Sequence, residues 1–150
     1  MRGAEQGPLL WEARTGSLGR DELRRFAMRL RREVAGGREF HCLVTGDARL
    51  RELNRRFLGK DWATDVLSFP AGHGAALGEL AISIDRAREQ AREQGHTVGT
   101  AVKILMLHGL LHLLGMDHEK DRGEMARAER GWREKLALPA GLIERADEGC

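Results

Sequence analysis

The residues best suited to chemistry are three of the six histidines, which stand close together at His108, His112 and His118. His108 and His112 are four residues apart in an apolar run, so on a helix of about 3.6 residues per turn their imidazoles share one face. Gly115 follows where this helix must end, because a residue without a Cβ readily adopts the left-handed conformation that turns the chain. The turn can bring His118 back as a third ligand. Three imidazoles with one open position match a catalytic zinc site, and other borderline metals would suit the same ligands.

The spacing of these histidines, with Gly115 in register, also resembles the helix-and-turn frame of the metzincin proteases. In those proteases a glutamate general base follows the first histidine, whereas this chain has Gly109. The predicted site therefore has a metal with a bound water, but it lacks the general base that would take the proton from that water. We expect Gly109 to leave room beside the metal for a bulky group such as a phosphate, and peptide hydrolysis by the metzincin route is disfavoured.

Residues 108–118 resemble the signature of the YbeY family of bacterial metal-dependent endoribonucleases, which mature ribosomal RNA. Two further sequence blocks also match that family, and all three blocks occur in the same order as in the family. The first block is Asn54 with Gly59-Lys60-Asp61 and residues 64–70 (TDVLSFP), and the second is residues 77–83 (LGELAIS). Met125 and Glu129 match the family pattern more weakly. The resemblance thus spans mainly residues 54–118.

The resemblance implies endonucleolytic cleavage of single-stranded RNA in ribosomal RNA processing, small-subunit maturation and ribosome quality control, with the ribosome and its assembly factors as partners. It implies one zinc ion on His108, His112 and His118, or another divalent transition metal on the same ligands. Water on the metal is then the attacking group, and no carboxylate can be assigned as general base. Lys60 and Arg56 are the expected contacts to neighbouring phosphates, and Arg56 is also the candidate for a direct catalytic role.

The chain departs from the family at Leu58, where the family has an arginine that is one of its functional residues. Leucine offers a phosphate no donor. An alternative interpretation is therefore a non-catalytic ribosome-assembly factor in which the metal is structural, so that its removal would unfold the protein. A metzincin-like metalloprotease is a further alternative, which Gly109 disfavours.

Composition predicts a cytoplasmic protein that folds as one domain over residues 1–150. The formal net charge is only +2, but residues 20–38 contain seven arginines, which could lie against phosphates or form a solvated helix face. The two cysteines, Cys42 and Cys150, make no disulfide framework and fit a reducing compartment. No apolar stretch reaches the roughly 18 residues that a membrane span needs.

Periodicity predicts an α+β fold with a small mixed sheet of about four strands packed with helices. A central buried helix over residues 98–114 would carry the metal ligands, since its side chains are apolar almost all round. Asp47 and Asp85 are the expected caps of the helices that follow them, and Leu50, Leu53 and Phe57 the expected inner face of the first of these. The expected strands cover residues 8–14, 39–45, 66–69 and 77–84; the expected helices cover residues 20–35, 48–57, 86–94 and 98–114, with a last one starting near residue 121.

Overall fold

The computed structural model describes residues 9–12, 19–117 and 119–139 of the 150-residue chain. Its elements follow one another in the mixed order that the sequence predicts. The strands are β1 (Leu9–Trp11), β2 (Phe40–Thr45), β3 (Val66–Pro70) and β4 (Gly78–Ser83). The helices are α2 (Arg20–Glu33), α3 (Asp47–Leu58), α4 (Ile84–Gln94), α5 (Val98–Leu113) and α6 (Glu124–Lys135).

The strands form one four-stranded sheet in the order β1-β2-β4-β3. β1, β2 and β4 run parallel to one another, whereas β3 runs antiparallel to β4 at the edge. Along the chain, a helix lies between the two strands of each parallel pair, because parallel strands require a crossover connection. Pro70, which has no N–H to donate, stands at the end of the edge strand β3. The prediction of an α+β fold with a small mixed sheet is confirmed.

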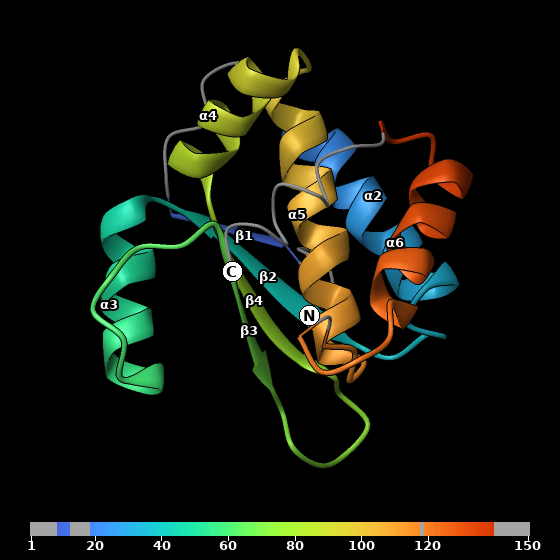
Figure 1. Ribbon diagram of the computed structural model, residues 1–150, viewed down its shortest axis with the longest axis horizontal. Helices are drawn as coiled ribbons and strands as arrows, with labels where there is room; N and C mark the ends of the chain where they lie inside the picture. Colours follow the sequence, from blue (N-terminus) through green and yellow to red (C-terminus); the bar gives the residue numbers. More distant parts are fainter. Residues whose placement is uncertain (1–8, 13–18, 118, 140–150) are drawn as a thin grey trace.

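Helix α5 occupies the centre of the core, because eleven of its sixteen residues are buried. One side of α5 packs on β3 and β4, and α2, α4 and α6 contact its remaining sides. Figure 1 shows α5, α2 and α6 together on one side of the sheet. The predicted central helix therefore exists, and its burial gives any side chain at its end a rigid support.

Helix α3 lies on the opposite side of the sheet (Figure 1) and packs on β3 and β4. Leu50 is fully buried there, against Leu67 and Ala81. The expectation for Phe57 is wrong, since this side chain is 59% exposed and meets Phe69 edge to face at a centroid distance of 5.9 Å. Asn54 is buried in its place. Helical periodicity located the face of α3, but the side chains of its last turn, Phe57 and Leu58, are exposed.

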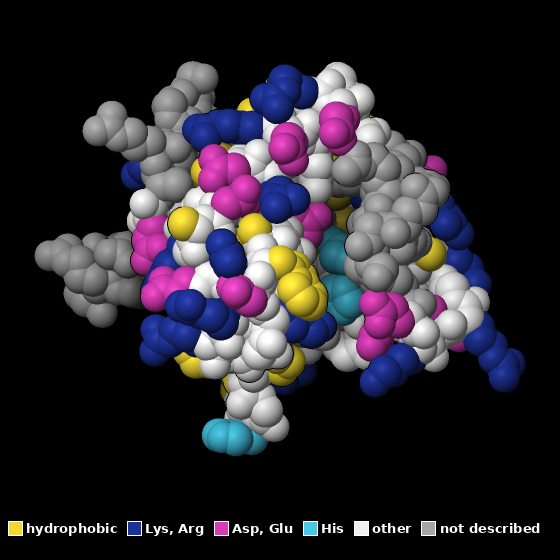
Figure 2. Space-filling view, turned by 60° about the vertical axis from the view of Figure 1, so that its left-hand side comes forward, with side chains coloured by type: hydrophobic (Ala, Val, Ile, Leu, Met, Phe, Trp, Pro, Cys, Tyr) yellow, Lys and Arg dark blue, Asp and Glu magenta, His cyan; other side chains and the backbone are white. Residues whose placement is uncertain are grey.

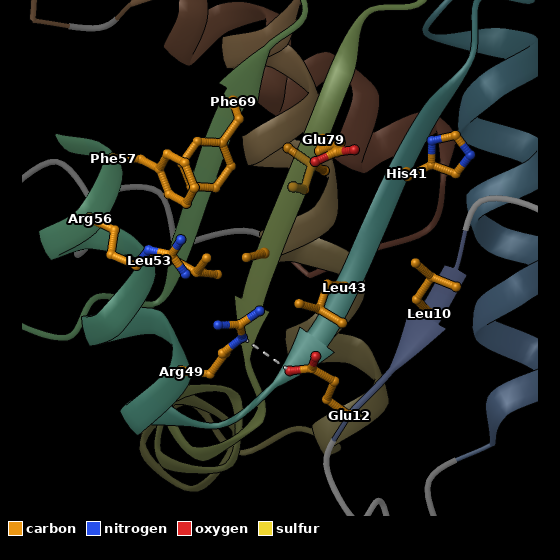
Figure 3. Close-up of a pocket in the computed structure, with 12 residues that line it drawn as sticks. Leu10, Glu12, His41, Leu43, Arg49, Leu53, Arg56, Phe57, Phe69 and Glu79 are labelled. Carbon is orange, nitrogen blue, oxygen red and sulfur yellow. Dashed lines mark ion pairs between the residues drawn. The ribbon is translucent and has the colours of Figure 1, made fainter.

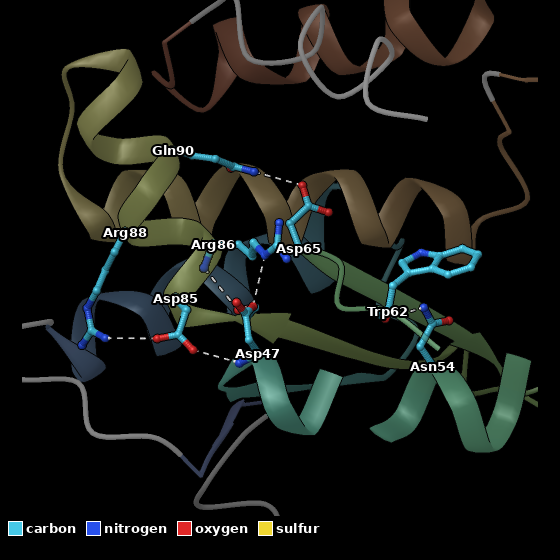
Figure 4. Close-up of polar contacts among 9 residues, drawn as sticks. Asp47, Asn54, Trp62, Asp65, Asp85, Arg86, Arg88 and Gln90 are labelled. Carbon is cyan, nitrogen blue, oxygen red and sulfur yellow. Dashed lines mark hydrogen bonds and ion pairs between the residues drawn. The ribbon is translucent and has the colours of Figure 1, made fainter. Parts of the chain in front are cut away.

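The starts of α3 and α4 are joined by polar contacts that differ from the predicted caps (Figure 4). The side chain that caps α4 is Ser83, whose Oγ accepts from Arg86 N at 3.2 Å. Asp85 Oδ2 instead accepts from Asp47 N at 2.8 Å, at the first residue of α3. Asp47 Oδ1 in turn accepts from Ser83 Oγ at 2.6 Å. The two aspartates thus link the starts of the two helices, because β2 and β4 end side by side in the sheet.

Among residues 9–12, 19–117 and 119–139, none of the helices combines the length and the apolar character that crossing a bilayer requires. The last helix, α6, is amphipathic and begins as the sequence indicates. Asp121 Oδ2 accepts from Met125 N at 2.8 Å, so this carboxylate satisfies a free N–H in the first turn of α6. Met125 and Glu129 are fully buried, and α6 contacts α5.

Candidate metal centre

His108 and His112 lie one turn apart at the carboxyl end of α5, and their Nε2 atoms are 3.2 Å apart. The ring planes are inclined at 76°. Two nitrogens bound tetrahedrally to one zinc at about 2.0–2.1 Å are separated by about 3.3 Å. The observed separation therefore suits two ligands of a shared ion. His112 is partly exposed. Figure 2 shows histidine atoms in a recess near the centre of the view, beside hydrophobic and acidic side chains, and further histidine atoms that project at the lower end of the molecule.

The other ring nitrogen of His108 is held by Glu129, a buried residue of α6. His108 Nδ1 lies 2.7 Å from Glu129 Oε1, and Glu129 is 0% exposed. Burial raises the pKa of Glu129, but its hydrogen bond and charge interaction with His108, together with the charge of Arg133, outweigh burial and lower the pKa. A carboxylate can only accept. In the neutral form of His108, Nδ1 therefore carries the proton, and Nε2, the atom nearer His112, carries the lone pair.

The chain turns sharply after α5, as the prediction for Gly115 required. Gly115 has φ +96°, and its N–H donates to His112 O at 2.9 Å. The predicted third ligand, His118, lies outside the described residues. Asp117 Oδ1 accepts from Glu119 N at 3.0 Å, so this carboxylate stabilises the turn. Within the described part of the chain, no group of three His, Cys, Asp or Glu side chains is placed to hold a metal.

Gly109 does not leave the open space that the sequence suggested. A Cβ at this position would lie 2.9 Å from Leu80 Cδ2 and 3.0 Å from Val66 Cγ2. The Gly109 carbonyl also accepts a hydrogen bond from Ser68 Oγ at 3.1 Å. The absent side chain thus allows α5 to approach β3 and β4 closely. Gly109 lies on the face of α5 that is turned toward the sheet, so no space is open there.

Lys60 and Leu58 lie where α3 ends and the connection to β3 begins. Leu58, the last residue of α3, is 47% exposed, and Gly59 ends the helix with φ +71°. Lys60 is exposed, with Nζ 5.9 Å from the centre of the Trp62 ring. Asn54 Nδ2 donates to Trp62 O at 2.9 Å and fixes this connection to α3 (Figure 4). The Lys60 ammonium and the exposed Trp62 ring therefore lie side by side on the surface.

Arg56 faces a different surface from His108 and His112. It lines a groove of about 680 Å³ between α3 and the sheet face that α5 does not cover (Figure 3). Its guanidinium lies 5.3 Å from the Phe57 ring centre. Glu12 and Glu79 line the same groove. The structure thus brings His108 and His112 together, but it does not bring Arg56 to them.

Comparison with known sequences and folds identifies the family of this chain. The sequence model of the family described as "Endoribonuclease YbeY" matches residues 18–137. A relative in Solibacter usitatus, named "Endoribonuclease YbeY", is 58% identical over 145 residues, covering 97% of this chain and 98% of the relative. The chain belongs to the endoribonuclease YbeY family. A relative of the same name in Koribacter versatilis is 54% identical over 115 residues, which is 76% of each chain.

Among solved structures, the solution structure of TM1509 from Thermotoga maritima has a similar fold. Its TM-score is 0.62 at 27% identity, over 85% of this chain and 87% of that one. The resemblance to YbeY endoribonucleases that the histidine spacing and the two upstream blocks indicated is therefore confirmed. Family membership brings metal-dependent nuclease chemistry with it, whereas the identity of the metal and its ligands remain predictions.

Sequence reasoning misses two residues of this centre as site residues. In the sequence, Glu129 is noticed only as a weak match to the family pattern, and Arg133 is not noticed at all. Arg133 Nη2 donates to Glu129 Oε2 at 2.7 Å, and both side chains are almost fully buried. A charged pair four residues apart on the inner face of an amphipathic helix is the signal that could have found them.

Proposed function

We propose that this protein is a cytoplasmic endoribonuclease that hydrolyses single-stranded RNA during ribosomal RNA processing, with the ribosome and its assembly factors as partners. One zinc ion would be held by His108, His112 and His118. The observation that carries the proposal is the 3.2 Å approach of the two Nε2 atoms, one of them backed by a buried carboxylate. Carboxylate-backed imidazoles are the usual partners of protein-bound zinc.

When bound, such an ion supplies Lewis-acid polarisation of a phosphoryl oxygen. The chain's own residues would bind and orient the RNA. Lys60 offers a charge to a phosphate, and the exposed ring of Trp62 beside it offers a surface on which a base can stack. Arg56 lies in the groove of the other sheet face. We therefore propose that Arg56 binds a phosphate further along the RNA and takes no part at the bond that is cleaved.

The alternative of a non-catalytic assembly factor rests on Leu58. Its side chain is 47% exposed at the end of α3, so the position is accessible but offers an incoming phosphate no donor. The metalloprotease alternative loses further support, because a glutamate at position 109 would collide with Leu80 and Val66. Digestion of casein by the purified protein would revive it.

The test is cleavage of a single-stranded RNA by the wild type, Leu58→Arg and Leu58→Arg/His108→Ala, with bound metal measured on the same samples. An arginine would supply a planar fork of donors that stabilises developing charge. We expect weak, metal-dependent cleavage by the wild type, at least severalfold faster cleavage by Leu58→Arg, and none by the double variant. If all three are inactive while the first two hold metal, the assembly factor replaces the nuclease.

A further inference from the structure

The buried contacts behind His108 form a chain of three side chains. Glu129 accepts from His108 Nδ1 with one oxygen and from Arg133 Nη2 with the other, each at 2.7 Å. Arg133 is 2% exposed, and its Nη1 donates to Pro139 O at 3.1 Å. A buried ion pair of this kind adds little net stability compared with apolar side chains of the same size. The Glu129–Arg133 pair instead affects His108, which Glu129 contacts.

We propose that Glu129 and Arg133 act together as positioning residues that keep His108 in the tautomer with its proton on Nδ1, so that Nε2 carries the lone pair that binds the metal. This inference rests on the proposed metal centre. Glu129 provides the acceptor that Nδ1–H requires. Arg133 occupies the second oxygen and orients the carboxylate, because a guanidinium can only donate.

The role of Arg133 gives an unusual expectation for Glu129→Gln, which keeps size and shape. Arg133 needs an acceptor and would take the amide oxygen of the new side chain. The amide NH₂ would then face His108 Nδ1 and donate to it. The imidazole would move its proton to Nε2, the atom that must bind the metal. Replacement of a carboxylate by an amide beside a histidine acts through the same tautomer change in serine proteases.

The experiment compares full-length wild type, Glu129→Gln, Arg133→Met and Glu129→Gln/Arg133→Met. In each protein, ¹⁵N NMR of the metal-free histidine side chains reports the tautomer of His108, and competition with a chromophoric chelator gives the affinity for zinc. Glu134→Gln is the matched control, because Glu134 is exposed on the same helix. Circular dichroism reports whether each variant is folded.

We expect Glu129→Gln to carry the proton on Nε2 and to bind zinc about 10- to 100-fold more weakly. Arg133→Met should keep the proton on Nδ1. In the double variant the amide is free to turn its oxygen toward Nδ1, so the tautomer should revert and zinc affinity should return to within a few fold of wild type. The control should behave as wild type. A residue that merely stabilises the fold would give no such rescue.

The proposal is overturned if folded Glu129→Gln keeps the wild-type tautomer, or if the double variant is no better than the single one. Should Glu129→Gln not fold, Arg133→Met and the double variant still decide, because a proton on Nε2 in either contradicts the proposal. Zinc binding without RNA cleavage by the wild type would refute the proposed nuclease and leave this inference standing. The two failures are therefore distinguishable.

Discussion

Replacement of Gly109 by alanine tests why α5 carries a glycine beside its first histidine. The new Cβ would lie 2.9 Å from Leu80 Cδ2 and 3.0 Å from Val66 Cγ2, whereas carbon atoms in contact prefer about 3.5–4.0 Å. Both neighbours belong to strands of the sheet, and Leu80 is buried. The helix and the sheet must therefore separate by several tenths of an ångström, or the two side chains must leave their rotamers.

The expected magnitude is a difference between two terms. Overpacking of a core costs about 1–3 kcal/mol, while glycine to alanine inside a helix gains up to about 1 kcal/mol. Gly109→Ala should therefore lower the free energy of unfolding by about 0–2 kcal/mol. At Gly131, inside α6, a new Cβ would meet no atom of the described residues within 4 Å, so Gly131→Ala carries the helix gain alone.

The two variants should thus differ by about 1–3 kcal/mol, which is roughly 2–12 °C in Tm for a protein of this size. Urea and thermal unfolding of the metal-free proteins, followed by circular dichroism, measure the difference. If both alanines stabilise the protein equally, the space beside Gly109 is open. The packing explanation would then be wrong, and the expectation of room for a phosphate would return.

Three further predictions concern other residues. His112→Ala should reduce bound zinc far below one ion per chain by elemental analysis, whereas His96→Ala should not. His96 precedes the start of α5 and its Nδ1 lies against the carbonyl of Thr97, whereas His108 and His112 lie at the carboxyl end of that helix. In a Cys150→Ser background, Ellman's reagent should label Cys42 only in denaturant, since burial raises the pKa of its thiol to about 12. Trp62→Ala should weaken single-stranded RNA binding about fivefold or more in fluorescence anisotropy, and Trp62→Phe should weaken it less; equal affinities would contradict stacking.

Features that depend on local spacing could be predicted from the amino-acid sequence alone. The four-residue separation of His108 and His112 fixes their common face on any helix. The apolar run around them predicts a buried helix, and Gly115 predicts the turn that follows. The order of strands and helices indicated the α+β class, and the histidine stretch with its two upstream blocks identified the family. The histidine spacing, the apolar run and Gly115 each lie within a few residues of the feature that they predict.

Which side chains from distant segments meet depends on the packing of the elements against one another. Glu129 stands 21 residues after His108, and its role depends on how α6 packs against α5. The contact between Asp47 and Asp85 depends on β2 and β4 ending side by side. Periodicity states which face of an element is apolar, but not which neighbour covers that face. For this reason the close approach of Gly109 to the sheet, and the position of Arg56 on the other side of it, appear only in the folded protein.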